Sequence, residues 1–236
     1  MESHPREECL SLPTYRLITF DAYSGLADFK TTLIPVITRI LALPADAAEP
    51  FLTTWRTKQL DAAALSNALS RGRMSFHDCT ALALDYAAGK HDVTVPASHR
   101  DELIEAWYPL QPWPEAANVL GTLRDRGHLL AILSNGDRAM LESIAAQVAV
   151  KIDHIFSTES AGVYKPDPKV YDLPIDKLGL KRDEYLHVAG GANDVIGAKS
   201  AGIACYWNNR TGERVLYPQF TADFEGPNLT GLLDIL

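Results

Sequence analysis

The 236-residue sequence contains little cysteine and no long apolar run. Its three cysteines, Cys9, Cys79 and Cys205, are odd in number and widely spaced, which argues against a disulfide framework and against a CxxC metal site. A reducing compartment is the simplest interpretation, so we expect a cytoplasmic protein. No stretch of about 18 apolar residues occurs, and residues 1–9 are polar. The sequence therefore predicts neither a transmembrane helix nor a signal peptide.

The sequence also lacks an excess of positive charge. It has 22 Lys and Arg residues against 30 Asp and Glu residues, which gives a net charge of −8. Such an acidic chain has no electrostatic footprint for nucleic acid or for an anionic membrane surface, so we expect neither as a partner. A small anionic substrate remains compatible with this charge, because one local Arg or Lys is enough to bind it.

The elements that the sequence does contain fall into two kinds. Residues 15–20 form a short apolar run that is typical of a buried strand and ends at Asp21. From residue 28 to about residue 108, apolar residues recur at three- or four-residue spacing, which predicts helices. Beyond residue 112, strands at 128–133, 155–157, 185–189 and 204–207 are expected to alternate with helices at 115–126, 138–148, 166–178 and 194–201. A short closing helix is expected at 229–236, whereas 218–228 is predicted to be irregular.

Alternating strands and helices predict an α/β fold with a Rossmann-like, doubly wound parallel sheet as its core. We expect this core to comprise residues 1–27 and 111–236, with a helical cap, residues 28–110, inserted after the first strand. In such sheets, ligands bind at the carboxyl ends of the strands. That rule brings Asp21, Ser134, Asn135 and the 189–194 loop to one place.

The first two of these strand ends allow both structural and functional interpretations. Asp21 follows a buried strand, so it is either a turn residue or a partly desolvated carboxylate with a raised pKa. Ser134 and Asn135 lie between a strand and a helix, where backbone amides favour a bound anion. The alternative is that Asn135 or Asp137 only caps the following helix.

Two further charged residues are equally ambiguous when each is taken alone. Lys165 precedes Pro166 and Pro168. Its ammonium either offsets the charge of a buried carboxylate or is solvated in a loop. Asp194 is expected in the first turn of a helix, where a carboxylate is favourable whether or not it has a function.

Together and in this order, the segments resemble the haloacid dehalogenase superfamily, and more narrowly the L-2-haloacid dehalogenases. In the predicted cap, residues 55–60 (WRTKQL) are similar to the arginine-bearing helix of that family. The resemblance extends from about residue 15 to residue 212. The other resembling stretches are residues 20–23 (FDAY) with Leu26, 133–136 (LSNG), 163–167 (VYKPD) with Val170 and Tyr171, Asp194 with 197–199 (GAK), and 207–212 (WNNRTG).

The resemblance implies a mechanism without a cofactor. Asp21 would attack C2 of a short 2-haloacid and displace halide with inversion, and water would then hydrolyse the resulting ester. Lys165 would keep Asp21 ionised and oriented, and Asp194 would pair with Lys165. The residues that would bind the small anionic substrate are Tyr23, Arg56, Ser134 and Asn135. Trp55 and Phe76 are candidates for apolar walls or for core residues of the cap. Relatives are often homodimers, although nothing in the sequence marks a dimer interface.

Phosphatase activity is less compatible with the sequence. Phosphatases of this superfamily carry a second Asp two residues after the first, to protonate the leaving group. Tyr23 stands at that position and cannot replace an acid of that strength. Asp194 is the only carboxylate in 189–194, which is sparse for Mg²⁺. We therefore predict metal-independent hydrolysis and no metal site.

Two departures from the family pattern leave the substrate and its stereochemistry open. Residues 189–191 are Ala-Gly-Gly where the family typically has Ser-Ser-Asn, whose side chains help to organise the lysine and the hydrolytic water. Residues 24–25 are Ser-Gly where the family usually has Gly-Thr. Two alternatives therefore remain: a hydrolase of the same mechanism acting on another electrophile, such as a small epoxide acid, and a homologue that binds without turnover. His187, near the 189–191 loop, is interpreted as a strand histidine that faces the core.

Overall fold

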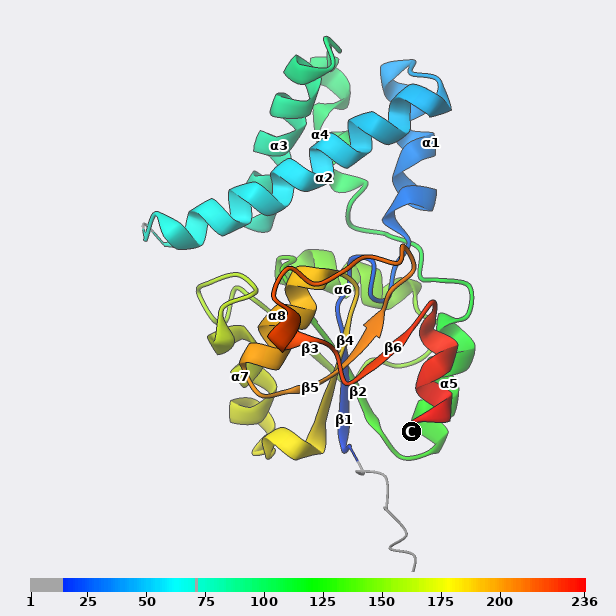
Figure 1. Ribbon diagram of the computed structural model, residues 1–236. Helices are drawn as coiled ribbons and strands as arrows, with labels where there is room; N and C mark the ends of the chain where they lie inside the picture. The colour runs from blue at the N-terminus through cyan, green and yellow to red at the C-terminus, as the bar shows by residue number, and fades with distance from the viewer. Residues whose placement is uncertain (1–14, 71) are drawn as a thin grey trace, which may run out of the picture.

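The computed structural model describes residues 15–70 and 72–236, so Cys9 and the polar residues 1–9 lie outside the described residues. A six-stranded parallel sheet has the order β3-β2-β1-β4-β5-β6. This sheet, with helices on both sides, confirms the predicted α/β class (Figure 1). The strands are β1 (Leu17–Phe20), β2 (Leu129–Ser134), β3 (His154–Ser157), β4 (Tyr185–Ala189), β5 (Ala204–Asn208) and β6 (Phe224–Gly226).

Both faces of the sheet are covered, because neighbouring strand residues point to opposite faces and both sets are apolar. In β1, Leu17 joins the cluster of buried residues that includes α7 (Pro168–Leu178) and α8 (Ala192–Ser200). Ile18 and Phe20 join the cluster that includes α5 (Ala116–Asp125) and α6 (Arg138–Gln147). Because it is buried on both faces, the sheet fixes the positions of the residues that follow its strands.

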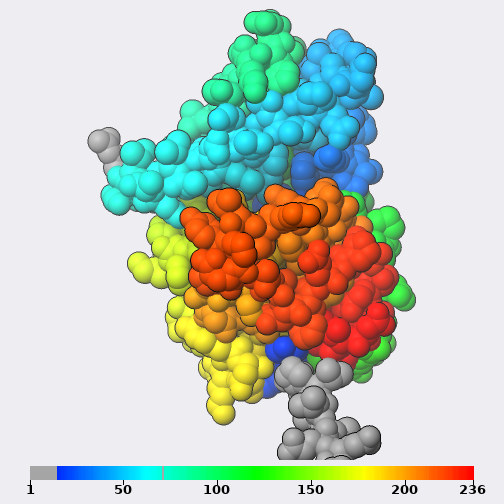
Figure 2. All heavy atoms as spheres, viewed as in Figure 1, coloured from blue at the N-terminus to red at the C-terminus, as the bar shows by residue number. Residues whose placement is uncertain are grey.

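Four helices form a separate group beyond the carboxyl ends of the strands, which we call the helical layer, residues 29–105 (Figures 1 and 2). The first of them begins at Asp28, whose carboxylate accepts hydrogen bonds from the amides of Lys30 and Thr31. The boundaries expected for the helical cap, residues 28 and 110, remain a prediction. The helices are α1 (Phe29–Leu41), α2 (Ala45–Ala68), α3 (Phe76–Lys90) and α4 (Arg100–Glu105), with a 3-10 turn, η1 (Ala97–His99), before α4.

The prediction of an irregular segment at 218–228 is wrong. This segment contains a 3-10 turn, η3 (Pro218–Phe220), and the edge strand β6, in which Phe224 pairs with Tyr206 of β5. With three residues, none of them buried, β6 is too short to show an apolar pattern. The predicted closing helix is a 3-10 helix, η4 (Leu229–Asp234), and a further 3-10 turn, η2 (Arg182–Glu184), precedes β4.

The apolar residues of α1 and α2 pack inside the helical layer. Leu33, Ile37 and Phe51 have no exposed surface. Among residues 15–70 and 72–236, no single helix is long and apolar enough to cross a membrane. Only α1 and α2 taken together, with a bend of 112° between them, reach the required length and composition.

Candidate active site

A cavity of about 470 Å³ lies between the carboxyl edge of the sheet and α2. Its mouth opens between the helical layer and the loops at the carboxyl edge of the sheet, as its exposed lining residues show: Lys30, Leu60, Ala64, Pro166, Asn193, Thr211 and Glu213. In Figure 2, α2 (cyan) lies across the part of the core that carries the loop after β5 (orange). Of the predicted site residues, the cavity is lined by Asp21, Tyr23, Arg56, Asn135, Lys165 and Asp194.

The two carboxylate oxygens of Asp21 differ in their hydrogen bonds. Its Oδ1 accepts a hydrogen bond from Ser134 Oγ at 2.9 Å and lies 3.2 Å from Lys165 Nζ. No described residue donates to its Oδ2. Burial raises the pKa of Asp21 above the ordinary carboxyl value, while Lys165 opposes that rise. Asp21 is therefore an oriented carboxylate with one oxygen available for attack.

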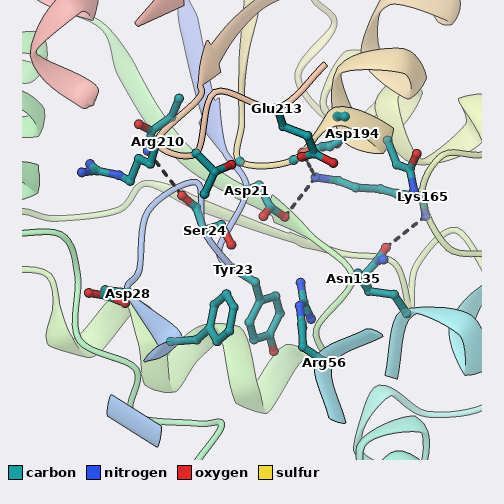
Figure 3. Close-up of a pocket in the computed structure, with 18 of the residues that line it drawn as sticks. Asp21, Tyr23, Ser24, Asp28, Arg56, Asn135, Lys165, Asp194, Arg210 and Glu213 are labelled. Carbon is teal, nitrogen blue, oxygen red and sulfur yellow. Dashed lines mark hydrogen bonds and ion pairs between the residues drawn. The ribbon is translucent and has the colours of Figure 1, made fainter. Parts of the chain in front are cut away.

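Lys165 joins the two buried aspartates of the site (Figure 3). Its Nζ lies 2.9 Å from Asp194 Oδ2, and the hydroxyl of Tyr171 donates to Asp194 Oδ1 at 2.7 Å. Burial raises the pKa of Asp194, but His187, Lys165 and Tyr171 outweigh it and hold the pKa below the ordinary value. Asp194 thus remains an anion, and it anchors the lysine.

The two residues predicted to bind a substrate carboxylate differ in position. Ser134 is fully buried, does not line the cavity, and gives its hydroxyl hydrogen to Asp21. Asn135 lines the cavity, and its Oδ1 accepts from the backbone amide of Lys165 at 3.0 Å. Because Oδ1 is occupied, the side-chain amide group of Asn135 is the part left to donate to a ligand.

Arg56 enters the cavity from α2. Its guanidinium donates to Gln59 Oε1 at 2.5 Å and lies 4.8 Å from the centre of the Tyr23 ring. Burial lowers the pKa of Arg56, and no carboxylate pairs with it among the described residues. Tyr23 turns its ring towards the cavity and its hydroxyl towards Met140. Arg56 therefore has unoccupied donors for an anion in an aromatic setting.

Trp55 and Phe76 are core residues of the helical layer, not cavity walls. Both are fully buried, and neither lines the cavity. The indole nitrogen of Trp55 donates to the carbonyl of Thr80, and the Phe76 ring packs at 5.4 Å from that of Tyr23. Phe76 therefore supports the cavity residue Tyr23 from behind.

His187 was interpreted as a core histidine, and it is fully buried, but it also contacts the charged site. Its Nε2 lies 2.9 Å from Asp194 Oδ2 and 3.4 Å from Lys165 Nζ. Its Nδ1 lies 2.7 Å from Thr19 Oγ1. A usable signal existed in the alternation of side chains, because Thr19 lies two residues before Asp21 and His187 lies two residues before Ala189.

Asp137 does not cap its own helix, contrary to one of the sequence alternatives. Its carboxylate accepts instead from the backbone amides of Phe76 and His77, at 2.9 and 2.8 Å, at the start of α3. It also pairs with Arg73 at 2.7 Å, with both side chains nearly buried. The residue that follows the Ser134–Gly136 turn thus fastens the helical layer to the core.

The two departures from the family pattern lie against each other. A Cβ on Gly190 would lie 2.3 Å from the backbone nitrogen of Gly25, so a side chain at position 190 cannot fit beside the 24–25 turn. Ser24 adopts a φ of 71°, in the left-handed region. The backbone at residues 24–25 therefore packs directly against that of Gly190.

Comparisons with known proteins agree with this geometry. A model of the haloacid dehalogenase-like hydrolases matches residues 15–202. (S)-2-haloacid dehalogenase of Pseudomonas sp. (strain YL) is 32% identical over 221 residues, covering 92% of this chain and 93% of that protein. Haloacetate dehalogenase H-2 of Moraxella sp. (strain B) is 31% identical over 221 residues, covering 93% and 96%.

Solved structures extend the similarity to three dimensions. L-2-haloacid dehalogenase from Xanthobacter autotrophicus, with chloropropionic acid covalently bound, has a TM-score of 0.85 to this chain at 27% identity. The match covers 94% of this chain and 98% of that one. A second dehalogenase structure has a TM-score of 0.87 at 27% identity, with 96% and 99% covered. The chain belongs to the haloacid dehalogenase-like hydrolases.

Proposed function

We propose that this protein is a hydrolytic dehalogenase of short 2-haloacids and that the helical layer serves as its cap. The observation that carries the proposal is the state of Asp21, which lines a cavity that Arg56 also lines. Its Oδ1 is held by Ser134 and Lys165, while its Oδ2 accepts no hydrogen bond from the described residues. A carboxylate in that state is suited to in-line attack on carbon. The similar proteins named as (S)-2-haloacid and haloacetate dehalogenases support this choice of electrophile.

The first step forms an ester and releases halide. Asp21 Oδ2 attacks C2 of the substrate, the C2–O bond forms, and the carbon–halogen bond breaks with its electron pair leaving on the halide. The donors of Arg56 and the side-chain amide of Asn135 bind the substrate carboxylate or the departing halide. The protein supplies no proton to the leaving group, which is why Tyr23 is compatible at its position.

The second step regenerates Asp21. Water attacks the Asp21 carboxyl carbon, the bond from Oδ2 to the carboxyl carbon breaks, and a 2-hydroxyacid leaves with a proton released to solvent. Oδ1, held by Lys165 and Ser134, is the oxygen that carries negative charge in the tetrahedral intermediate. Lys165 thus supplies positive charge to both steps without a metal in the proposed scheme.

The test is halide release from each enantiomer of 2-chloropropionate with EDTA present. We expect halide from the (S)-enantiomer in wild-type protein and none above background from Asp21→Asn, because a neutral amide is a poor nucleophile. Asp183→Asn is the matched control, since Asp183 is exposed and remote from the cavity, and it should retain wild-type turnover.

A single turnover in ¹⁸O-labelled water identifies which carbon the water attacks. Hydrolysis at the ester carboxyl carbon places the label in Asp21, which mass spectrometry of the peptide containing residues 17–26 detects. Label found only in the product would mean direct attack of water on C2 and would remove Asp21 as nucleophile. A stable ester on Asp21 without halide turnover would favour the binding homologue instead.

A further inference from the structure

His187 is the one histidine that contacts the charged residues of the site among those described, and the proposed chemistry does not yet use it. It has no exposed surface and does not line the cavity, so it cannot touch a substrate. It stands on β4, paired in register with Thr19 of β1 and Cys205 of β5. A buried imidazole with several polar contacts must satisfy both of its nitrogens, which restricts its protonation state.

The contacts of His187 select one tautomer. Asp194 Oδ2, at 2.9 Å, can only accept, so Nε2 must carry a hydrogen and donate it. Nδ1 is then the acceptor nitrogen of the ring and lies 2.7 Å from Thr19 Oγ1, which is also 3.2 Å from the hydroxyl of Tyr185. Burial lowers the pKa of His187, and Lys165 acts in the same direction while Asp194 opposes it. The contacts place the hydrogen on Nε2, and the lowered pKa favours the neutral ring.

Asp194 Oδ2 is thereby shared by two donors, Lys165 at 2.9 Å and His187 at 2.9 Å. The other oxygen, Oδ1, accepts from Tyr171. The loop that follows β4 contributes no hydrogen-bonding side chain at positions 189–191, which are Ala-Gly-Gly. Of the three described side chains that hydrogen-bond Asp194, His187 is the one on β4, so it ties the carboxylate to the sheet.

We propose that His187 is a positioning residue, which holds Asp194 through Nε2 and so fixes the place of Lys165 beside Asp21. This inference extends the proposed function, since it assigns a role in the same reaction. The titratable groups that face the His187–Asp194 pair from neighbouring elements are Asp21 after β1, Lys165 before α7, Tyr171 on α7, Tyr185 on β4 and Cys205 on β5.

Two variants distinguish the hydrogen bond that His187 donates through Nε2 from the packing of its ring. His187→Phe keeps an aromatic ring against Tyr171, which His187 meets edge-on at 5.7 Å, but removes the donor. His187→Gln loses the ring but places an amide nitrogen where Nε2 was. We expect kcat to fall about 10- to 100-fold in His187→Phe with KM changed little, and to be largely retained in His187→Gln.

A second readout does not depend on turnover. The carboxyl ¹³C signal of Asp194 reports its ionisation, and its pKa should rise in His187→Phe but not in His187→Gln, because a carboxylate that loses a donor binds its proton more tightly. If the wild-type protein releases no halide, the proposed function fails while this titration still tests the hydrogen bond. Equal kcat and equal Asp194 pKa in wild type and His187→Phe would overturn the proposal.

A third measurement covers the case in which the variants do not fold. Imidazole ¹⁵N shifts in the wild-type protein distinguish the two tautomers, and we expect the hydrogen of His187 on Nε2. A hydrogen on Nδ1 alone would contradict the proposed donor. Impairment of His187→Gln as severe as that of His187→Phe, with both proteins folded, would show that ring packing rather than the hydrogen bond is required.

Discussion

The two sides of the cavity differ in how completely their charges are paired. On the sheet side, Lys165 contacts two aspartates, and Asp194 accepts from three side chains. On the helical side, Arg56 has a single polar side-chain partner, Gln59, and otherwise lies over aromatic rings. In the proposed mechanism, the core therefore holds the reacting groups in place before a substrate arrives, whereas the helical layer keeps donors unoccupied for the substrate itself.

This difference separates reactivity from affinity within one site. Groups that are already fixed by the protein lower the barrier, because no reorganisation is needed during the reaction. An arginine with free donors gains its partners only when an anion binds, so its contribution is to binding and orientation. Substitutions on the two sides should therefore change different kinetic constants.

The largest expected effect is that of Lys165→Met. The variant removes the cation between Asp21 and Asp194, so two buried carboxylates face each other and the nucleophile loses its orientation. We expect kcat to fall at least about 1,000-fold. Steady-state halide release checks this, with Lys177→Met, an exposed lysine on α7, as the control. A kcat within tenfold of wild type would contradict the division between the two sides.

Arg56→Lys should have a smaller effect, concentrated in KM. A lysine keeps the charge but cannot form the planar fork that grips a carboxylate, so we expect kcat/KM to fall about 10- to 100-fold. Inhibition by unhalogenated propionate should weaken in parallel, since that acid presents the carboxylate without the reacting carbon. Unchanged KM and inhibition would place Arg56 outside the binding site.

Asp137→Asn tests how much the contact between the core and the helical layer contributes to the stability of the folded protein. The variant leaves the nearly buried Arg73 without its anion and weakens the acceptor for two amides of α3. We expect the free energy of unfolding to fall by about 2–3 kcal/mol, measured by urea denaturation. Glu142→Gln, which breaks the exposed pair with Arg138, should change it little. Equal changes in the free energy of unfolding for Asp137→Asn and Glu142→Gln would show that the Asp137 contact does not help to hold the helical layer on the core.

The smallest expected effect is a difference in pH-dependent stability between Asp21 and Asp194. The folded pKa of Asp21 is raised, so its ionisation weakens the fold as pH rises, and Asp21→Asn should be at least as stable as wild type at pH 7. The folded pKa of Asp194 is lowered, so its stabilisation exists above the unfolded pKa and is lost as pH falls. Urea titrations of Asp21→Asn and Asp194→Asn between about pH 2 and 8 should therefore diverge in opposite directions. If the stabilities of the two variants, relative to wild type, changed in the same direction with pH, the predicted difference between Asp21 and Asp194 would be wrong.

The cavity residues at the carboxyl ends of the strands could be predicted from the sequence for a physical reason. Apolar runs that end in polar or Gly residues mark the carboxyl ends of parallel strands, and those ends must meet at one edge of the sheet. Asp21, Asn135 and Asp194 lie together as that rule requires. Lys165 comes from a loop, and the resemblance to a family supplied its role.

Contacts that depend on tertiary packing were not predicted. Ser134 was expected at the substrate, but its burial turns its hydroxyl to Asp21. Asp137 was considered only as one of two possible caps of the helix that follows it, because sequence proximity hides the α3 amides that approach from residues 76–77. His187 was interpreted by burial alone, and burial does not reveal that a charged partner lies seven residues later in the chain.

The mouth of the cavity has a consequence for how this protein acquires substrates. Thr211 and Glu213 line the entrance, and among the described residues no hydrogen bond or ion pair joins their side chains to Asp21, Lys165 or Asp194. Arg210 is held by Glu115 and the Trp113 ring. The entrance is thus set apart from the residues assigned to the chemistry. The size of the acid that can pass and the rate of its conversion are therefore expected to depend on different residues.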